Sequence, residues 1–484
     1  MDDEKALGKK MSGDSLGKRP GRYDELRNDP EMEGLTLYEK KALLVNRELD
    51  SHGMGKYQVI LQSIKASRLP PNQSFQWCIF FLCGFGYLLD LMYAQAFGLV
   101  APALQNELGF PDSQYANIFS SFNAGLCAGA FVWGVLVDII GRQYAFNLTV
   151  LIAAIFGLCL GAPSNYDGIL VLTAFNGFGI GGNIPIDTTI CLEFIPQNRR
   201  FLLALLSVFQ PLGVVVASGI AYGLVPKYAC AVGPDGTSVP ACSKVGPGEA
   251  CCTKASNMGW RYTLFTLGAI CLFIFFLRFI VFRFQESPKY LLYRGKDEKA
   301  VKVLHHIAKF NGRESAINME MFSALTDEDS SVGTRDTGTP MLGAGSKQIE
   351  SSLREKAKLE VVRYKILFST SQMARLTILV WIIYMFDYWG FSIAGSYLPK
   401  ILLVKNTAIK LTTAQTYRDF VIIYICGIPG VLLGALMYGV PRVGRKWAMV
   451  ASSALMAVSF FVYTTVNSEA SNIGLNLMEY FFQR

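Results

Sequence analysis

Two aspartates lie in the middle of long apolar runs, and each has a tyrosine three residues before it. Asp90 is the only charge in YLLDLMYAQAFGLVAP (87–102), and Asp387 is the only charge in YMFDYWGFSIAGSYLP (384–399). A carboxylate inside a bilayer is costly unless it is protonated, paired or hydrated. Because a carboxyl group can titrate between two faces of a membrane, both aspartates are candidates for binding a cation, a proton or both. The alternative is that each one only completes a hydrogen-bond network between helices.

The composition predicts that these runs are membrane helices. The 484 residues are 51% hydrophobic and only 17% charged, and the mean hydropathy is +0.32. An apolar helix of about 20 residues spans the hydrocarbon core of a bilayer. Nine runs reach this length, at about 77–104, 116–139, 145–162, 168–192, 201–225, 262–283, 374–398, 418–440 and 447–466. A tenth, NIGLNLMEYFFQR, is too short to cross. We therefore predict an all-α, polytopic membrane protein.

The short loops predict the orientation and the division of the chain. Lys and Arg are absent from the loops after the first and third runs and present after the second, fourth and eighth, so the positive-inside rule places the N-terminus in the cytosol. The net charge of +8 follows mainly from this bias, and we expect no nucleic-acid partner. We expect a cytosolic tail (1–76), a six-helix bundle (77–283), a cytosolic linker with partly helical flanks (284–373) and an incomplete second bundle (374–484).

Two patterns recur at nearly the same offset. The Tyr-x-x-Asp pattern, with its proline twelve residues after the aspartate, returns 297 residues later, and Gly141–Arg142 is matched by Gly444–Arg445 after 303 residues. Parallel structural repeats are known in transporter bundles. The matched offsets indicate a duplicated bundle.

In several motifs the chain resembles the major facilitator superfamily. GVLVDIIGRQ (134–143) is similar to the superfamily's loop signature between its second and third spans, with Gln143 in place of a basic residue. GFGIGGNIPIDTTICLEFIPQNRR (177–200) and FQESPKYLL (284–292) resemble the sugar-porter-like branch, particularly synaptic-vesicle-two-related and fungal sugar-transporter-like proteins. From the residues alone, Gly134 would permit close helix packing, Gly141 a tight turn, and Asp138 an ion pair with Arg142.

The resemblance implies roles for further residues. Spans one, four and seven would line a central cavity, so we expect the solute or proton to be bound by residues on or near these helices: Asp90, Tyr87, Asp387, Tyr384, Trp389, Asp187, Asn183 and Gln210. Each neutral polar residue could instead make an ordinary interhelical contact. A cytosolic gate would be formed by Gly134, Asp138, Gly141, Arg142, Glu193, Arg199, Arg200 and Glu286.

The chain departs from the family pattern in two places. Where proton-coupled sugar porters carry an arginine in span four, this chain has Thr173, so Asp90 would lack that partner. No Lys or Arg occupies the middle of any span, which disfavours anionic solutes. Family members have twelve spans, and we expect the end at Arg484 to reflect an incomplete gene model or splice product.

Four cysteines cluster in the predicted external loop between spans five and six. An oxidising compartment permits disulfides there, and we favour two bonds that join Cys230 and Cys242 to Cys251 and Cys252. A zinc site is the alternative. The other seven cysteines lie in spans and are interpreted as packing residues.

Together these features predict a monomeric secondary transporter in the bilayer. It would move a sugar- or polyol-like solute or an organic cation by alternating access, coupled to protons, in the plasma membrane rather than an internal one. The alternatives are a non-transporting membrane sensor or an inactive truncated transporter. We expect no enzyme activity, cofactor or resident metal, because no region gathers a nucleophile, a base and metal ligands.

Overall fold

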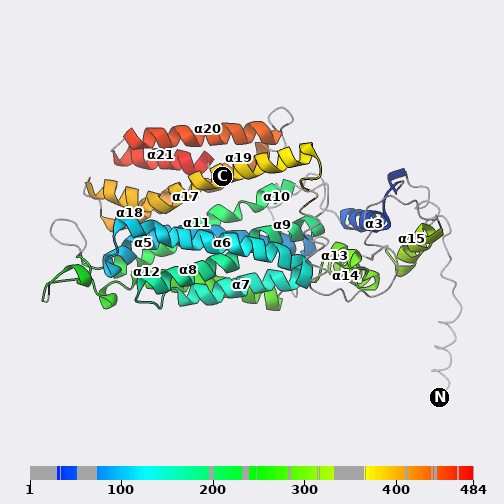
Figure 1. Ribbon diagram of the computed structural model, residues 1–484, viewed down its shortest axis with the longest axis horizontal. Coiled ribbons are helices and arrows are strands. Elements are labelled where there is room, and N and C mark those ends of the chain that lie inside the picture. The colour runs from blue at the N-terminus through cyan, green and yellow to red at the C-terminus, as the bar shows by residue number, and fades with distance from the viewer. Residues whose placement is uncertain are drawn as a thin grey trace, which may run out of the picture. The chain divides into compact units, whose positions relative to one another are not determined.

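The computed structural model describes residues 30–32, 34–51, 74–195, 201–231, 239–246, 248–281, 285–312, 314–315, 317–331, 365, 367–408, 412–437, 440, 444–465 and 468–482. Throughout these ranges the regular secondary structure is helical (Figure 1), and an isolated bridge joins Ala241 to Cys252. The predicted all-α, polytopic fold is confirmed. Eight helical segments in the described residues are long and apolar enough to cross a membrane.

The first six spans form one set of packed helices. They are α5 (Ser74–Leu108), α6 (Asp112–Ile140), α7 (Arg142–Cys159), α8 (Tyr166–Ile180) with α9 (Asn183–Phe194), α10 (Phe201–Leu206) with α11 (Phe209–Leu224), and α12 (Gly259–Phe276), which continues into a π-helical turn (Leu277–Val281). Side chains of α5 form much of the buried core: Leu89, Met92, Tyr93, Ala96 and Leu99 are fully buried.

Three of the expected spans are interrupted, each next to a proline. Pro185, Pro211 and Pro429 follow the interruptions between α8 and α9, between α10 and α11, and between α18 (Thr413–Ile425) and α19 (Gly427–Met437). A proline inside a helix lacks the N–H that would bond the carbonyl four residues earlier, and its ring crowds that carbonyl. The continuous runs of hydropathy did not reveal these interruptions.

The described helices that follow the linker belong to the same compact unit as the first set. They are α17 (Ser371–Ala408), which extends beyond the expected end at residue 398, then α18, α19, α20 (Gly444–Thr465) and α21 (Glu469–Phe482). In Figure 1, α20 and α21 run side by side. The Tyr417 hydroxyl on α18 donates a hydrogen bond to the Leu99 carbonyl on α5 at 2.6 Å.

A separate compact unit combines part of the tail with part of the linker. It contains α3 (Leu37–Ser51), α13 (Pro288–Tyr293), α14 (Asp297–Phe310) and α15 (Met319–Ser331). The Lys41 ammonium on α3 pairs with Asp297 on α14 at 2.5 Å, and Val45 and Phe322 are buried in this unit. The tail helix is therefore held by the linker helices through both an ion pair and apolar contacts.

Candidate functional site

Asp90 is buried inside the first helical set, and no hydrogen bond of ordinary geometry reaches its carboxyl group from the described residues. The side chain is only 3% exposed, and neither carboxyl oxygen bonds to any residue in the part of the chain that the structure describes. Asn183, the first residue of α9, is a close polar neighbour of Asp90. Asn183 is fully buried, and its amide oxygen and nitrogen are likewise without partners among the described residues. The two side chains therefore place several polar atoms together in a buried region.

Asp187, one turn further along α9, has a cationic partner that the sequence reasoning missed. The Arg278 guanidinium lies 3.3 Å from the Asp187 carboxylate, and both side chains are 0% exposed. Arg278 also donates to the backbone carbonyls of Leu82 and Phe146, at 3.0 and 3.1 Å. Its guanidinium lies 3.8 Å from the Phe146 ring centroid. The charge of Asp187 is therefore balanced by Arg278, which also contacts two backbone carbonyls and one aromatic ring.

The position of Arg278 explains why the sequence did not reveal it. The residue lies near the end of the sixth apolar run, where an arginine normally extends to the membrane interface. Here it belongs to the π-helical turn, and its side chain is buried within the bundle. No Lys or Arg occupies the middle of a span, as stated above, but the side chain of Arg278 extends from the end of the sixth run to the buried Asp187. The absence of a side chain on Gly86 makes room for the pair, since a Cβ there would overlap Asp187 and Arg278.

Tyr87 lies near this cluster but is bonded elsewhere. Its hydroxyl is 2.6 Å from the Thr188 hydroxyl on α9. Asp90, Tyr87, Asp187 and Asn183 therefore come from two adjacent helices, α5 and α9, and surround one buried region.

The other predicted binding residues are not joined to this region by a hydrogen bond or ion pair between described residues. Tyr384 and Trp389 are 66% and 59% exposed on α17, and Asp387 is exposed between them. Gln210 is half-buried at the start of α11.

The predicted gate residues meet at the turn between α6 and α7. Arg142 lies 3.0 Å from Asp138 and 3.1 Å from Glu193, so it bridges the end of α6 to the end of α9. Glu286 accepts hydrogen bonds from the backbone N–H groups of Arg142 and Gln143 at 3.1 and 3.4 Å. Burial raises the pKa of Glu286 above its ordinary value, although these bonds oppose the shift. Arg142 therefore connects the ends of α6 and α9 through its side chain, and it contacts Glu286, which follows the sixth span, through its backbone N–H.

The two glycines of this motif have different surroundings. Gly141 adopts a φ of 105°, which suits glycine because it has no Cβ. A Cβ at Gly134 would meet nothing within 4 Å, so close helix packing does not explain that glycine. Arg199 and Arg200 lie outside the described residues.

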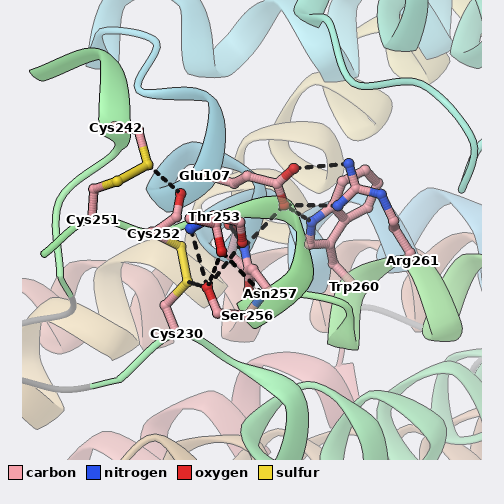
Figure 2. The surroundings of a disulfide bond; sticks show 11 residues. Glu107, Cys230, Cys242, Cys251, Cys252, Thr253, Ser256, Asn257, Trp260 and Arg261 are labelled. Atoms are coloured by element: carbon pink, nitrogen blue, oxygen red, sulfur yellow. Dashed lines mark hydrogen bonds and ion pairs between the residues drawn. A yellow bond between two sulfur atoms is a disulfide. The ribbon is translucent and has the colours of Figure 1, made fainter.

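The opposite end of the bundle holds the four loop cysteines. Cys230 is bonded to Cys252 and Cys242 to Cys251, so each bond takes one partner from the adjacent pair (Figure 2). No group of three or more potential metal-binding side chains is found among the described residues. The two disulfides therefore cross-link the loop that precedes α12.

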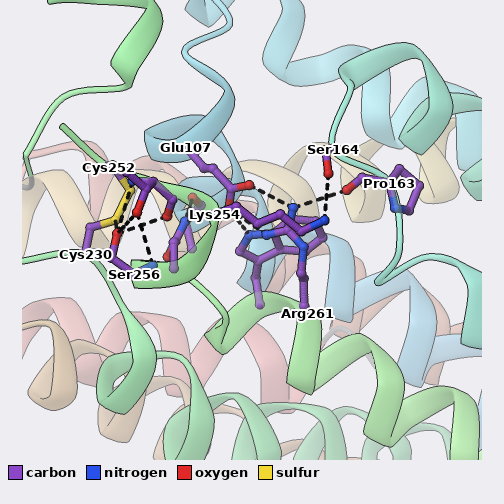
Figure 3. A network of polar contacts seen from close by, with 12 residues as sticks. Glu107, Pro163, Ser164, Cys230, Cys252, Lys254, Ser256 and Arg261 are labelled. Atoms are coloured by element: carbon purple, nitrogen blue, oxygen red, sulfur yellow. Dashed lines mark hydrogen bonds and ion pairs between the residues drawn. A yellow bond between two sulfur atoms is a disulfide. The ribbon is translucent and has the colours of Figure 1, made fainter.

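A buried ion pair beside this loop was also missed by the sequence reasoning. The Glu107 carboxylate at the end of α5 receives two bonds from Arg261 at the start of α12, at 2.7 and 2.8 Å (Figures 2 and 3). Trp260 and Asn257 donate to the same carboxylate at 2.9 and 3.4 Å. Arg261 also reaches the Pro163 carbonyl at 3.2 Å. The sequence did carry a signal for this pair. Glu107 follows the first span and Arg261 precedes the sixth, and both of these span ends were predicted to lie on the external side of the membrane.

The chain matches a family model and many known proteins. Residues 80–478 match the model described as Major Facilitator Superfamily. The chain is 33% identical to "MFS siderochrome iron transporter 1" of Ceriporiopsis subvermispora, over 91% of this chain and 76% of the relative. It is 24% identical to "Organic cation/carnitine transporter 7" of Arabidopsis thaliana, over 82% and 74% of the two chains. It is 26% identical to "Synaptic vesicle 2-related protein" of Xenopus laevis, over 81% and 60%.

A solved structure has a similar fold. The proton:xylose symporter XylE bound to 6-bromo-6-deoxy-D-glucose superposes with a TM-score of 0.58 at 15% identity, over 85% of this chain and 79% of that chain. At this identity the similarity concerns the fold alone.

Proposed function

The chain belongs to the major facilitator superfamily of membrane transporters, and we propose that it moves a small polar solute by alternating access, coupled to protons. The observation that carries this proposal is Asp90, a buried carboxyl group whose oxygens have no hydrogen-bond partner in the described part of the chain. An ionised carboxylate in such a place is costly, so the charged form requires water, a cation or a proton.

Asn183 provides a way for Asp90 to change its bonding with its charge. A protonated carboxyl group can donate to the amide oxygen of Asn183, whereas an ionised one can only accept from the amide nitrogen. Both amide atoms are without partners among the described residues. Protonation of Asp90 would therefore alter how α5 and α9 contact each other, which is what coupling to a conformational change needs.

The Asp187–Arg278 pair supports this assignment because it is already neutral. Asp187 has an arginine at 3.3 Å, two bonds of that arginine go to carbonyls, and both side chains are fully buried. Within this cluster Asp90 is the carboxyl group without such a partner. We therefore assign proton coupling to Asp90 and a positioning role to the Asp187–Arg278 pair.

We propose further that Asp387, Tyr384, Trp389 and Gln210 contact the solute. An aromatic ring beside a carboxylate suits stacking on a sugar ring or a cation. The charged cluster around Arg142 would form a gate on the cytosolic face, with the N-terminus on the same side and the disulfide loop outside. We expect a monomer in the plasma membrane.

One observation favours a sensor as a second candidate function. The unit of α3, α13, α14 and α15 joins the tail to the linker through the buried Lys41 side chain and a packed apolar core. A compact unit of this kind could bind a signalling partner. Solute accumulation by the purified protein would contradict a purely sensory role.

The test uses the purified chain in proteoliposomes with an imposed proton gradient, and radiolabelled xylose, glycerol and ethanolamine as probes. We expect Asp90→Asn to abolish accumulation against a gradient and to preserve counterflow exchange, which needs no net proton movement. Asp167→Asn is the matched control, because Asp167 is exposed in the first turn of α8. Accumulation by Asp90→Asn at the wild-type level would show that the coupling group lies elsewhere.

A further inference from the structure

The outer side of α14 carries more positive than negative charge. The segment 288–312, which contains α13 and α14, has six Lys or Arg residues and two Asp or Glu residues. Lys299, Lys302 and Lys309 are exposed and share one side of α14. Glu298 is exposed beside them and lies close to Lys299. We call the three lysines the α14 basic face, and together with Glu298 they leave a net charge of about two on this side.

The charges of the α14 basic face are available to a partner. Lys309 forms no ion pair with another residue in the part of the chain that the structure describes. Lys302 lies 2.6 Å from Glu298, but the two side chains are 72% and 70% exposed, so water screens this pair. Asp297 on the same helix does not offset the lysines, because it is paired with Lys41 on α3.

The opposite side of α14 is already used. Val301, Leu304 and Ile307 are at most 6% exposed, because they lie in the core of the unit of α3, α13, α14 and α15. A helix that binds in the groove of a partner protein presents its apolar side, and so does a helix that inserts into the bilayer boundary. Either mode would require this unit to open. The charged side therefore favours attraction to a negative surface.

The covalent connection keeps α14 near the membrane. Glu286 accepts a hydrogen bond from the backbone N–H of Arg142, at the turn between α6 and α7. α14 begins eleven residues after Glu286, and six of the intervening residues form α13, so the connection spans at most about 26 Å. In the proposed orientation this end of the bundle is cytosolic. The cytosolic leaflet carries the anionic lipids that attract basic segments next to membrane spans.

We propose that the α14 basic face binds the anionic lipid headgroups of the surrounding bilayer. This inference goes beyond the proposed transport function and does not depend on it. Each lysine near an anionic surface strengthens binding about fivefold, so a net charge of two favours the surface about 25-fold. Because Lys41 on α3 pairs with Asp297 on α14, the tail helix would be held at the surface together with the linker.

The experiment measures how fast an acetylating reagent modifies individual lysines of the full chain in nanodiscs, with mass spectrometry as the readout. Nanodiscs of phosphatidylcholine are compared with nanodiscs that also contain phosphatidylglycerol, an anionic lipid without a reactive amine. We expect Lys302 and Lys309 to react about tenfold or more slowly in the anionic nanodiscs. High salt should abolish the difference, because it screens the charges.

Two variants with opposite expected effects serve as matched controls. Lys299→Gln combined with Lys309→Gln leaves Lys302 beside Glu298 with no net charge, so the anionic lipid should no longer protect Lys302. Glu298→Gln removes the opposing charge and should increase the protection of Lys302 and Lys309 about fivefold. All three replaced side chains are exposed, so neither variant should disturb folding.

Several results would overturn this proposal and leave the transport function untouched. One is equal labelling of the lysines in the two kinds of nanodisc. Another is protection of Lys302 that persists in the double lysine variant, which would place the lipid contact elsewhere. Weaker protection in Glu298→Gln would contradict the electrostatic argument. Glycerol phosphate added to neutral nanodiscs offers a phosphate without a surface, and protection by it alone would indicate a discrete anion site instead.

Discussion

Removing Arg278 should destabilise the protein strongly, because it leaves a buried carboxylate without its counter-charge. In Arg278→Gln, Asp187 stays 0% exposed with no cation at 3.3 Å, and two backbone carbonyls lose a charged donor. Breaking a buried pair from one side costs about 3–5 kcal/mol. Solvent does not reduce this figure here, since neither side chain reaches water. We expect a loss of about that size in the free energy of unfolding.

The assay is a double-mutant cycle on the purified protein, followed by tryptophan fluorescence during denaturant unfolding in detergent. Asp187→Asn with Arg278→Gln removes both charges, so the double variant should be more stable than Arg278→Gln alone. Lys302→Gln is the control, because Lys302 and its partner Glu298 are 72% and 70% exposed and should contribute nothing measurable. Losses that simply add, or an Arg278→Gln variant as stable as the wild type, would refute the reasoning.

Three further predictions concern other parts of the chain. Gly86→Ala should lower the free energy of unfolding by about 1–3 kcal/mol, because the added Cβ would overlap Asp187 and Arg278. Gly219→Ala is the control and should cause no such loss, because a Cβ there would face open space. Equal effects of the two variants in unfolding assays would contradict this prediction. Because the folded pKa of Glu286 is raised, its contribution to stability is present below the unfolded pKa and lost as pH rises through the folded value. Glu286→Gln should flatten that part of the thermal stability–pH curve, and an unchanged curve would count against the burial argument. Mild reduction followed by alkylation and mass spectrometry should label Cys242 and Cys251 before Cys230 and Cys252, which are both buried; labelling in the reverse order would contradict the packing of the loop.

Hydropathy predicted the helices well because membrane spans must be long and apolar. It did not predict the interruptions beside Pro185, Pro211 and Pro429, since a proline changes backbone bonding without lowering the mean hydropathy. The aspartate pattern led to Asp90 and Asp387 because an isolated charge in an apolar run is conspicuous, whereas Asp187 was named through the family resemblance. Nothing in the pattern, however, indicated that Asp387 would lie exposed on α17 while Asp90 is buried on α5.

The partners of charged residues were the least predictable feature. Arg278 and Arg261 lie near the ends of the sixth span, where basic residues are ordinarily interpreted as topology signals. Their buried ion pairs depend on how far a long side chain reaches between packed helices, which spacing along one chain does not encode. The buried polar residues of α21, Asn472, Asn476 and Glu479, were overlooked for a related reason: the segment was judged only by its length, although these residues share one helical face.

If Asp90 carries the coupled proton, replacing it must separate solute movement from proton movement, and this can be measured during transport. A pH-sensitive dye inside proteoliposomes would report proton entry when solute is added outside, without an imposed proton gradient. We expect solute to acidify the interior of proteoliposomes that contain the wild type or Asp167→Asn, and we expect Asp90→Asn to exchange solute without acidification. Solute-driven acidification of unchanged size in Asp90→Asn would contradict it.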